Sequence, residues 1–253
     1  MKPFADHFSD IAEHYAAARP TYPPELFDWL ASVAPATRRA WDCAAGNGQA
    51  TIELARRFGQ VLATDASAAQ LARAPEHPRV TYRVAPAEAS GLPEATLDLV
   101  TVAQALHWLD LVSFYAEVRR VLVPGGVLAA WCYGFLVLND PAIDPPLQHF
   151  YGSVVGPYWA PERRWVESGY RTLDFPFAEL DAPPFAMTHE WTLRDLAAYL
   201  GTWSATEAYR RARGEDPVLP FVETIAAAWG PPASRRRIRW PLSLRVGRSR
   251  PPA

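Results

Sequence analysis

One segment, residues 41–51 (WDCAAGNGQAT), constrains the fold of this chain more than any other. An apolar stretch enters a turn that contains Gly46 and Gly48, and the residues after the turn have helical spacing. The next apolar stretch, residues 61–64, ends in Asp65. A strand, a glycine turn, a helix and a second strand in this order form a parallel βαβ unit, so the sequence predicts an α/β fold.

The glycine turn and the acid after the second strand also predict a binding site for a nucleoside-bearing ligand. Gly46 and Gly48 allow the backbone to approach a ligand closely and to adopt positive φ. The helix that begins near Gln49 directs free amide groups to the same place. Asp65 is expected to accept hydrogen bonds from both ribose hydroxyls. The alternatives are that the glycines form an ordinary tight turn and that Asp65 caps a helix. Because the glycine turn and the acid occur together in one βαβ unit, the ligand site is favoured.

Apolar strands alternate with helical segments through the first half of the chain. We expect strands at residues 40–44, 61–64, 80–84, 97–103 and 127–133, and helices at 8–18, 24–33, 49–58, 67–74 and 112–122. This alternation predicts a parallel sheet with crossover helices. The uncharged run at 121–138 has the length of a membrane span. Pro124 and two glycines interrupt it, however, and buried parallel strands are also continuous apolar runs, so we interpret it as a core strand.

The regular alternation stops after Tyr133. Residues 134–184 are rich in aromatic residues and proline, and such a long interruption is usually a functional lid or a substrate cap. Helices are expected there at 143–155 and 161–168, followed by a strand at 185–191, helices at 193–200, 205–213 and 218–229, and a strand at 238–246. The last strand alternates between apolar and polar residues, which favours an antiparallel strand at an edge of the sheet.

The length and the charge of the chain limit the kinds of function that it can have. A chain of 253 residues can bury one large core, and its net charge of −2 offers no basic field for nucleic acid or an anionic membrane. Lys2 is the only lysine and arginine is abundant, as in proteins from GC-rich bacterial genomes, so the arginine run at 235–239 is expected to be a solvated surface. These features predict a soluble enzyme with a small-molecule substrate.

Cys43 and Cys132 are the only cysteines. Neither belongs to a metal-binding pair, and no metal site is expected. A third predicted strand separates the two strands that contain them, so we expect no disulfide. Two isolated thiols suit a reducing compartment, and residues 1–7 contain no apolar signal region, so the sequence predicts a cytoplasmic location.

Residues after the third and fourth strands add to the predicted site. Glu88 follows the third strand, where an acid can accept a hydrogen bond from an adenine amino group; a solvated loop acid is the alternative. Gln104 lies at the tip of the fourth strand. A nicotinamide enzyme would have a third glycine where this chain has Thr51, and it would lack the acid Asp42. Hydride transfer is therefore the less favoured chemistry.

These residues together resemble the motifs of class I S-adenosylmethionine-dependent methyltransferases. The resemblance rests on the glycine loop, the ribose acid, an Ala-Glu pair, an acid in strand four and the turn before strand five (Asp42, Ala44, Gly46 and Gly48; Asp65; Ala87 and Glu88; Asp98; residues 122–126). Ala44 departs from the family, which usually has glycine there. The resemblance implies a Rossmann-like, seven-stranded, mostly parallel sheet of order 3-2-1-4-5-7-6, with strand seven antiparallel and helices on both faces.

A narrower resemblance is to the trans-aconitate methyltransferase-like branch, within the methyltransferase type 11 group. It is based on residues 15–23 (YAAARPTYP), 104–108 (QALHW) and 240–242 (WPL). Together with the interruption after Tyr133, it predicts a single domain over residues 1–253. In that domain residues 1–34 form a helical lid over the cofactor, and residues 134–184 form a cap insertion between strands five and six.

The cofactor implied by the resemblance is S-adenosylmethionine, with S-adenosylhomocysteine as its product. The N-terminal segment is implied to bring Tyr15 and Arg19 near the methionine carboxylate. The full set of residues implied to bind the cofactor is Tyr15, Arg19, Asp42, Ala44, Gly46, Gly48, Asp65, Ala66, Ala87, Glu88, Gln104 and Ala105.

The predicted reaction is methyl transfer to a small organic acceptor. The resemblance suggests a carboxylic acid of the trans-aconitate type, whereas the aromatic residues of the cap would suit a natural-product or quinone-like molecule. Residues expected to contact the acceptor or the sulfonium are Tyr22, His107, Trp108, Trp131 and Arg164, with Arg163 as a further candidate for an acid. Core packing is the alternative for each aromatic residue. His107 is the candidate general base, but a carboxylate acceptor needs no base.

Two other functions stay open on the sequence alone. One is a nicotinamide-dependent oxidoreductase, and the other is a non-catalytic protein that binds S-adenosylmethionine. Titration with both cofactors would separate the first, and a labelled-methyl assay would separate the second. A monomer or a homodimer is expected, without nucleic-acid or membrane partners.

Overall fold

A computed structural model of the chain describes residues 20–249. The predicted helix at 8–18, the predicted cofactor residues Tyr15 and Arg19, and most of the predicted lid lie outside these residues. The chain divides into two compact units, which we call the sheet unit and the helical unit. Of the described residues, the sheet unit contains 22–134, 164–186 and 241–249, and the helical unit contains 135–163 and 187–240.

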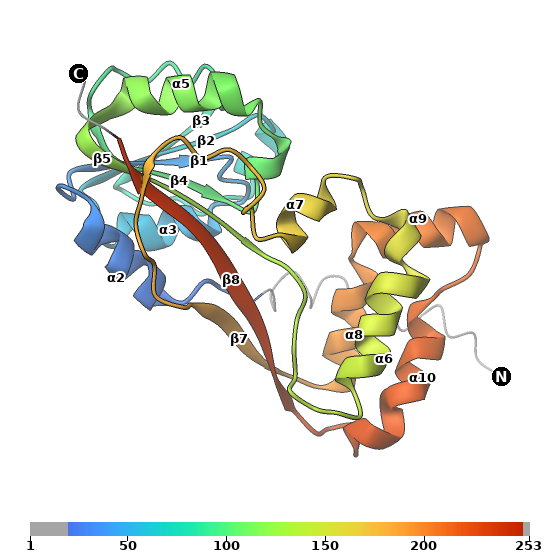
Figure 1. Cartoon of the computed structure of the whole chain (residues 1–253). Helices are drawn as coiled ribbons and strands as arrows, with labels where there is room; N and C mark the ends of the chain where they lie inside the picture. The colour runs from blue at the N-terminus through green and yellow to red at the C-terminus, as the bar shows by residue number, and fades with distance from the viewer. Residues whose placement is uncertain (1–19, 250–253) are drawn as a thin grey trace. The chain divides into compact units, whose positions relative to one another are not determined.

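Five parallel strands form the centre of the sheet unit (Figure 1). Their order is β3 (Val80–Val84), β2 (Gln60–Asp65), β1 (Arg39–Cys43), β4 (Leu97–Ala103) and β5 (Leu122–Tyr133). Every pairing among them is parallel, so their C-terminal ends lie along one edge of the sheet. All residues of β4 except the last are buried, as its apolar sequence requires. The predicted strand order 3-2-1-4-5 is confirmed.

The last strand, β8 (Arg236–Arg248), is antiparallel to β5. Its residues 242–248 pair with residues 127–133 of β5. The predicted antiparallel strand beside strand five is therefore confirmed.

The sixth strand lies beside the last strand, as the predicted order 5-7-6 requires, but it is divided into two separate strands. The strand expected at 185–191 forms as β7 (Ala186–Trp191), which pairs with β8 off the main path of the sheet. The position next to the C-terminal part of β8 is taken instead by the two-residue strand β6 (Ala178–Glu179). Pro183 and Pro184 lie between β6 and β7. Because proline has no N–H to donate, the ladder beside β8 is interrupted there.

Helices cover both faces of the sheet, as predicted (Figure 1). The helices α2 (Pro24–Val33) and α3 (Gln49–Ala55) lie on one face, and α5 (Leu111–Val121) lies on the other. The inner side of α5 joins Trp41 and most other large residues of that face in one buried cluster. The short helix α4 (Ala68–Leu71) begins at Ser67, whose hydroxyl accepts a hydrogen bond from the Gln70 amide.

Asp98 of β4 is a fully buried acid with a structural partner at the start of β1. Its Oδ2 accepts hydrogen bonds from the backbone amides of Arg38, at 2.9 Å, and Arg39, at 3.0 Å. The Arg38 guanidinium, which is largely exposed, donates to Oδ1 at 3.1 Å. All of these donors lie at the N-terminal end of β1, so the hydrogen bonds of Asp98 are made away from the C-terminal edge of the sheet.

The helical unit contains α6 (Asp144–His149), α8 (Leu193–Gly201), α9 (Ser204–Arg213) and α10 (Val218–Trp229). The helix expected at 143–155 begins as α6 and continues as a π-helical turn at Phe150–Val154. Aromatic contacts form its core, such as Phe150 against Phe221 with ring centroids 4.9 Å apart. α8 begins at a capping box between Thr192 and Asp195.

The segment predicted as a cap, residues 134–184, contributes to both units: residues 135–163 belong to the helical unit and 164–184 to the sheet unit. The helix expected at 161–168 is the shorter α7 (Arg163–Glu167). Whether this segment covers a substrate stays a prediction.

The apolar run at 121–138 forms β5 and the chain that follows it, as predicted. Between residues 20 and 249 no helix has the length and apolar character needed to cross a membrane. Cys43 of β1 and Cys132 of β5 are buried and free, and β4 lies between their strands.

Candidate active site

The glycine loop after β1 has an unusual backbone. Ala44, Gly46 and Gly48 all have positive φ, at +55°, +56° and +82°. The loop continues the sheet for one more step, because the Ala45 amide donates to the Thr64 carbonyl at 2.9 Å. A Cβ added to Gly46 would meet no atom of residues 20–249 within 4 Å, so no described residue covers the backbone on that side. The predicted close approach of backbone to ligand is thus sterically available at Gly46.

Gly48, by contrast, is enclosed. A Cβ there would lie 2.9 Å from the Tyr82 hydroxyl and 3.2 Å from the Ala74 side chain. Tyr82 is itself held by a hydrogen bond from its hydroxyl to the Pro75 carbonyl at 2.9 Å. The glycine is required both by its φ and by this contact, which sequence reasoning missed because Tyr82 lies on β3.

Asp65 at the end of β2 joins two turns. Its Oδ2 accepts a hydrogen bond from the Gly46 amide at 2.8 Å, and its Oδ1 accepts one from the Ser67 amide at 2.8 Å. The carboxylate is half-buried, and each oxygen has a second lone pair for a further donor. Ala66, the next residue, is exposed. The structure therefore places Asp65 against the glycine loop, as the ribose prediction requires, while the ribose contact itself stays a prediction.

Asp42 is enclosed within the sheet unit. Its carboxylate accepts hydrogen bonds from the Thr51 hydroxyl at 2.6 Å and from the Thr101 hydroxyl at 2.9 Å. Burial raises the pKa of Asp42 from 3.8 to about 6, although both hydroxyls lower it. Asp42 thus links β1, α3 and β4 directly below the loop, and its side chain is 1% exposed. Sequence reasoning treated Thr51 only as a missing glycine and did not foresee this bond.

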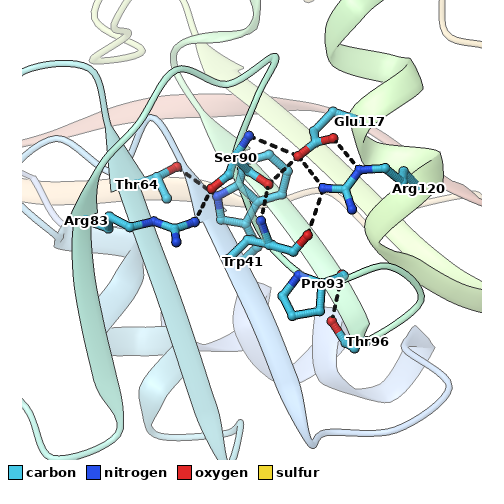
Figure 2. A network of polar contacts seen from close by, with 9 residues as sticks. Trp41, Thr64, Arg83, Ser90, Pro93, Thr96, Glu117 and Arg120 are labelled. Atoms are coloured by element: carbon cyan, nitrogen blue, oxygen red, sulfur yellow. Dashed lines mark hydrogen bonds and ion pairs between the residues drawn. The ribbon is translucent and has the colours of Figure 1, made fainter.

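Glu88 follows β3, and the loop that carries it is fastened to α5 (Figure 2). Glu88 accepts a hydrogen bond from the Asp110 amide at 3.1 Å, and Ala87 beside it is buried. Glu117 of α5 accepts hydrogen bonds from the Ser90 amide, at 2.9 Å, and from the Ser90 hydroxyl. This clamp fixes the loop immediately after the predicted adenine-binding position.

Arg120 completes the clamp from the next turn of α5. It forms an ion pair with Glu117 at 2.7 Å and donates to the Leu92 carbonyl at 2.8 Å. The hydrogen bond from Arg120 is the main reason why the pKa of Glu117 lies below its usual value. Sequence reasoning missed both residues, because two charges three positions apart on a helix suggest only an exposed pair.

Gln104 has positive φ, at +57°, directly after β4. Its side chain bridges to the end of β5: Nε2 donates to the Tyr133 carbonyl at 3.1 Å, and the Tyr133 amide donates to Oε1 at 2.8 Å. The backbone amide of Gln104 donates to the Trp131 carbonyl at 2.8 Å. Gln104 therefore holds two strand ends together, and Ala105 beside it is half-buried. Contact of either residue with a cofactor stays a prediction.

His107 lies in the single helical turn Leu106–Trp108 after β4. Its Nδ1 is 2.9 Å from the hydroxyl of Tyr170, a fully buried residue that sequence reasoning did not single out. The His107 ring also packs against Trp108, with centroids 4.7 Å apart, and Trp108 is 62% exposed. His107 and Trp108 therefore lie at the same edge of the sheet as the glycine loop.

Tyr22 and Trp131 form part of a packed aromatic group with Phe27. The Tyr22 and Trp131 rings meet edge to face, with centroids 5.5 Å apart. Trp131 is fully buried, and its Nε1 has no hydrogen-bond partner among residues 20–249. Core packing is thus the observed environment of Trp131, and a contact with the acceptor stays a prediction.

Arg164 of α7 is exposed and stacks on its neighbour Trp165, with the guanidinium carbon 4.8 Å from the ring centroid. No carboxylate within the described part of the chain forms an ion pair with it. Arg163, by contrast, belongs to the helical unit and stacks on Tyr151 and Trp159. The structure thus assigns the two neighbouring arginines to different units.

Most of the predicted site lies at the C-terminal edge of the sheet. The ends of β1, β2, β3 and β4 and the turns after them carry Asp42, Gly46, Asp65, Glu88 and His107. In the described ranges, no group of three or more His, Cys, Asp or Glu is arranged to hold a metal ion. Burial raises the pKa of the Cys43 thiol well above its usual range, with Asp42 adding to the shift, and this disfavours the thiolate form.

Comparisons with known proteins agree with this geometry. A family model for a methyltransferase domain matches residues 41–130, from β1 into β5. A protein of Dictyostelium discoideum, provisionally named a methyltransferase, is 34% identical over 229 residues, or 89% of this chain and 87% of that protein. An uncharacterised methyltransferase of Mycobacterium tuberculosis is 40% identical over 123 residues, or 48% of this chain and 49% of that protein.

A solved structure from Anaeromyxobacter dehalogenans, provisionally named a type II methyltransferase, is also similar. It is 49% identical, has a TM-score of 0.88, and is matched over 92% of this chain and 99% of its own. The strand order, the glycine loop and the matched relatives lead to one assignment. The chain belongs to the class I S-adenosylmethionine-dependent methyltransferases, and its cofactor is S-adenosylmethionine.

Proposed function

We propose that this methyltransferase acts on a small organic acid and methylates its carboxylate oxygen. The observation that carries the proposal is the set of groups at the C-terminal edge of the sheet. An imidazole held by Tyr170 and an exposed indole follow β4 at the same edge of the sheet as the glycine loop after β1. Neither a thiolate nor a metal cluster is found at this edge within the described residues. A reaction that needs alignment rather than a protein nucleophile suits these groups.

The residues of the glycine loop fit the cofactor. The open side of Gly46 leaves room for a ligand against the backbone, and the half-buried Asp65 keeps lone pairs for hydroxyl donors. Glu88, at the end of the clamped loop, is the residue we assign to the adenine amino group. S-adenosylmethionine, when bound, supplies an already activated methyl group. The chain's own residues then have to bind, orient and exclude water.

The acid specificity is supported by Arg164. Its guanidinium is exposed, is pre-oriented on Trp165 and has no carboxylate partner between residues 20 and 249. A planar guanidinium pairs well with a carboxylate. The resemblance to the trans-aconitate methyltransferase-like branch points to the same class of acceptor. A natural-product or quinone-like acceptor is the second candidate, supported by the exposed Trp108.

Other features of the proposal concern the setting of the protein. Two buried free thiols support a cytoplasmic location, and the arginine-rich sequence supports a GC-rich bacterial source. A monomer or a homodimer without nucleic-acid or membrane partners is proposed on the near-neutral charge.

The test is a methyl-transfer assay with S-adenosylmethionine labelled at the methyl group. Purified full-length protein is incubated with a panel of di- and tricarboxylic acids and, separately, of flat phenolic and quinone-like compounds. We expect labelled esters, which mild alkali hydrolyses to release labelled methanol. Label that appears only in alkali-stable products of the second panel would contradict the carboxylate assignment. Arg164→Gln is expected to raise the KM for the acid, while Arg194→Gln, an exchange of another arginine, serves as the control.

A further inference from the structure

The pair formed by His107 and Tyr170 decides which nitrogen of the imidazole carries the proton. We propose that Tyr170 fixes His107 as the Nε2–H tautomer, so that His107 serves the acceptor as a hydrogen-bond donor and not as a general base. The use of this donor by an acceptor rests on the proposed function. The tautomer itself rests only on contacts within the sheet unit.

The number of hydrogens that the two groups can donate fixes the direction of the Tyr170–His107 hydrogen bond. A tyrosine hydroxyl has one hydrogen to donate and two lone pairs that accept. Within residues 20–249 the fully buried Tyr170 hydroxyl has one hydrogen-bond partner, His107 Nδ1 at 2.9 Å. If Nδ1 donated in this contact, the hydroxyl hydrogen would be buried without an acceptor, so the arrangement that satisfies both groups has the hydroxyl donating to Nδ1. Nδ1 is then the acceptor, and a neutral imidazole that accepts at Nδ1 carries its hydrogen on Nε2.

Tyr170 is well suited to remain a donor. Its side chain is fully buried, and this burial raises the pKa of its hydroxyl far above the usual value. A proton added at His107 Nδ1 would displace the hydroxyl hydrogen from the one acceptor that it has in the described part of the chain. A buried hydroxyl without an acceptor is costly, so the contact opposes that protonation.

The backbone around Tyr170 is built to hold this position. Gly169 and Tyr170 have consecutive positive φ values of +61° and +63°, and the second is unusual for a residue with a side chain. A Cβ on Gly169 would lie 2.7 Å from the Ser243 hydroxyl, so only glycine fits. The Tyr170 carbonyl accepts from the Arg245 guanidinium at 2.8 Å. Strained backbone persists where surrounding contacts determine it fully, and such positions concentrate at functional sites.

The tautomer bears on the chemistry. A general base needs a ring nitrogen with a free lone pair, but here the Nδ1 lone pair accepts from Tyr170 and Nε2 carries a hydrogen. An Nε2–H group suits an acceptor that already has a lone pair and needs no deprotonation, which is the property of a carboxylate. An Nε2–H donor therefore favours a carboxylate acceptor over acceptors that must first lose a proton.

Nitrogen NMR of the full-length protein, labelled with ¹⁵N in histidine, tests the tautomer without any acceptor. Long-range ¹H–¹⁵N correlations at neutral pH distinguish a protonated ring nitrogen from a bare one, and His107→Gln identifies the His107 signals. We expect Nε2 protonated and Nδ1 bare, with and without S-adenosylhomocysteine. A bare Nε2, or two protonated nitrogens, would overturn the proposal.

Tyr170→Phe tests whether Tyr170 sets the tautomer. It removes the donor and keeps the ring, so the His107 signals should move toward a mixture of both tautomers. Tyr115→Phe is the matched control, because Tyr115 is also buried and its hydroxyl donates to the Asp174 carbonyl at 2.7 Å, away from His107. An unchanged His107 tautomer in Tyr170→Phe would refute the role of Tyr170. If that variant does not fold, the wild-type spectrum still decides the tautomer.

The methyl-transfer assay then separates a donor from a base. Loss of one hydrogen bond to the acceptor in His107→Ala should lower turnover about 2- to 10-fold. Loss of a general base would lower it by about 10²- to 10⁴-fold. His107→Gln, whose side-chain amide can donate in place of Nε2–H, is expected to recover part of the activity. Failure to find any acceptor would count against the proposed function and would leave the NMR result standing.

Discussion

The Thr51 hydroxyl lies 2.6 Å from Asp42 Oδ2, and both residues are buried. This bond joins the first turn of α3 to the end of β1, on either side of the glycine loop. Thr101 adds a second hydroxyl donor from β4 at 2.9 Å. The glycine loop is therefore supported by a buried carboxylate, whose desolvation cost is only partly offset by two neutral donors.

The stability of the protein should report the charge of Asp42. Its pKa rises from 3.8 to about 6 on folding, mainly because of burial. Between these values the folded state binds more protons than the unfolded state. The stabilising contribution of Asp42 to the free energy of unfolding is therefore complete below pH 3.8 and is lost as the pH rises through about 6. Asp42→Asn removes this dependence. Between pH 4 and pH 7 the free energy of unfolding of the variant, relative to that of the wild type, should therefore rise by on the order of 2 kcal/mol.

Urea unfolding of both proteins at several pH values measures this gain. Asp28→Asn, a change of an exposed acid on α2, should show no comparable trend. A difference in unfolding free energy between Asp42→Asn and wild type that is constant across this range would contradict the assignment.

The two glycines of the loop should differ in their response to alanine. Both have positive φ, which costs about 1–2 kcal/mol for a residue with a side chain. Among contacts with residues 20–249, only the methyl group added at Gly48 also meets another atom, the Tyr82 hydroxyl at 2.9 Å. We therefore expect Gly48→Ala to lower the free energy of unfolding more than Gly46→Ala. Equal losses in urea unfolding would show that Tyr82 does not enclose Gly48.

The clamp between α5 and the Glu88 loop should contribute measurably to stability. Glu117→Gln keeps an acceptor for Ser90 but loses the charge that binds Arg120, and hydrogen bonds to charged groups contribute about 1.5–3 kcal/mol. Glu190→Gln, at an ion pair whose partners are both exposed, should cost less than about 1 kcal/mol. Hydrogen exchange of the amides at 85–93 should accelerate in Glu117→Gln alone. Equal exchange in both variants would contradict the clamp.

The sequence predicted those parts of the structure that depend on local pattern. Alternating apolar segments located β1 to β5 within a few residues, and the alternation at 238–246 predicted the antiparallel β8. The glycine loop and Asp65 could be placed together because the βαβ unit joins consecutive strands. These features need only the spacing of neighbouring residues in the chain.

The missed features depend on contacts between distant residues. Tyr170 meets His107 across 63 positions, and nothing in the residues near Tyr170 indicates a partner at the end of β4. The division of the sixth strand into β6 and β7 follows from Pro183 and Pro184, a local signal that the prediction did not use. The sequence analysis used Thr51 only as the absence of a third glycine, whereas the structure shows that its hydroxyl is the nearest partner of Asp42.

The glycine loop and Asp65 are predicted to bind the adenosyl group of the cofactor. Titration calorimetry with S-adenosylhomocysteine tests it most directly, using wild type, Asp65→Ala and the exposed-site control Asp28→Ala, each checked for folding by thermal unfolding. We predict binding by the wild type and the control, and at least about 10-fold weaker binding by Asp65→Ala, because hydrogen bonds to a charged group are lost. Absence of binding by the wild type, or equal affinity of Asp65→Ala, would contradict the account.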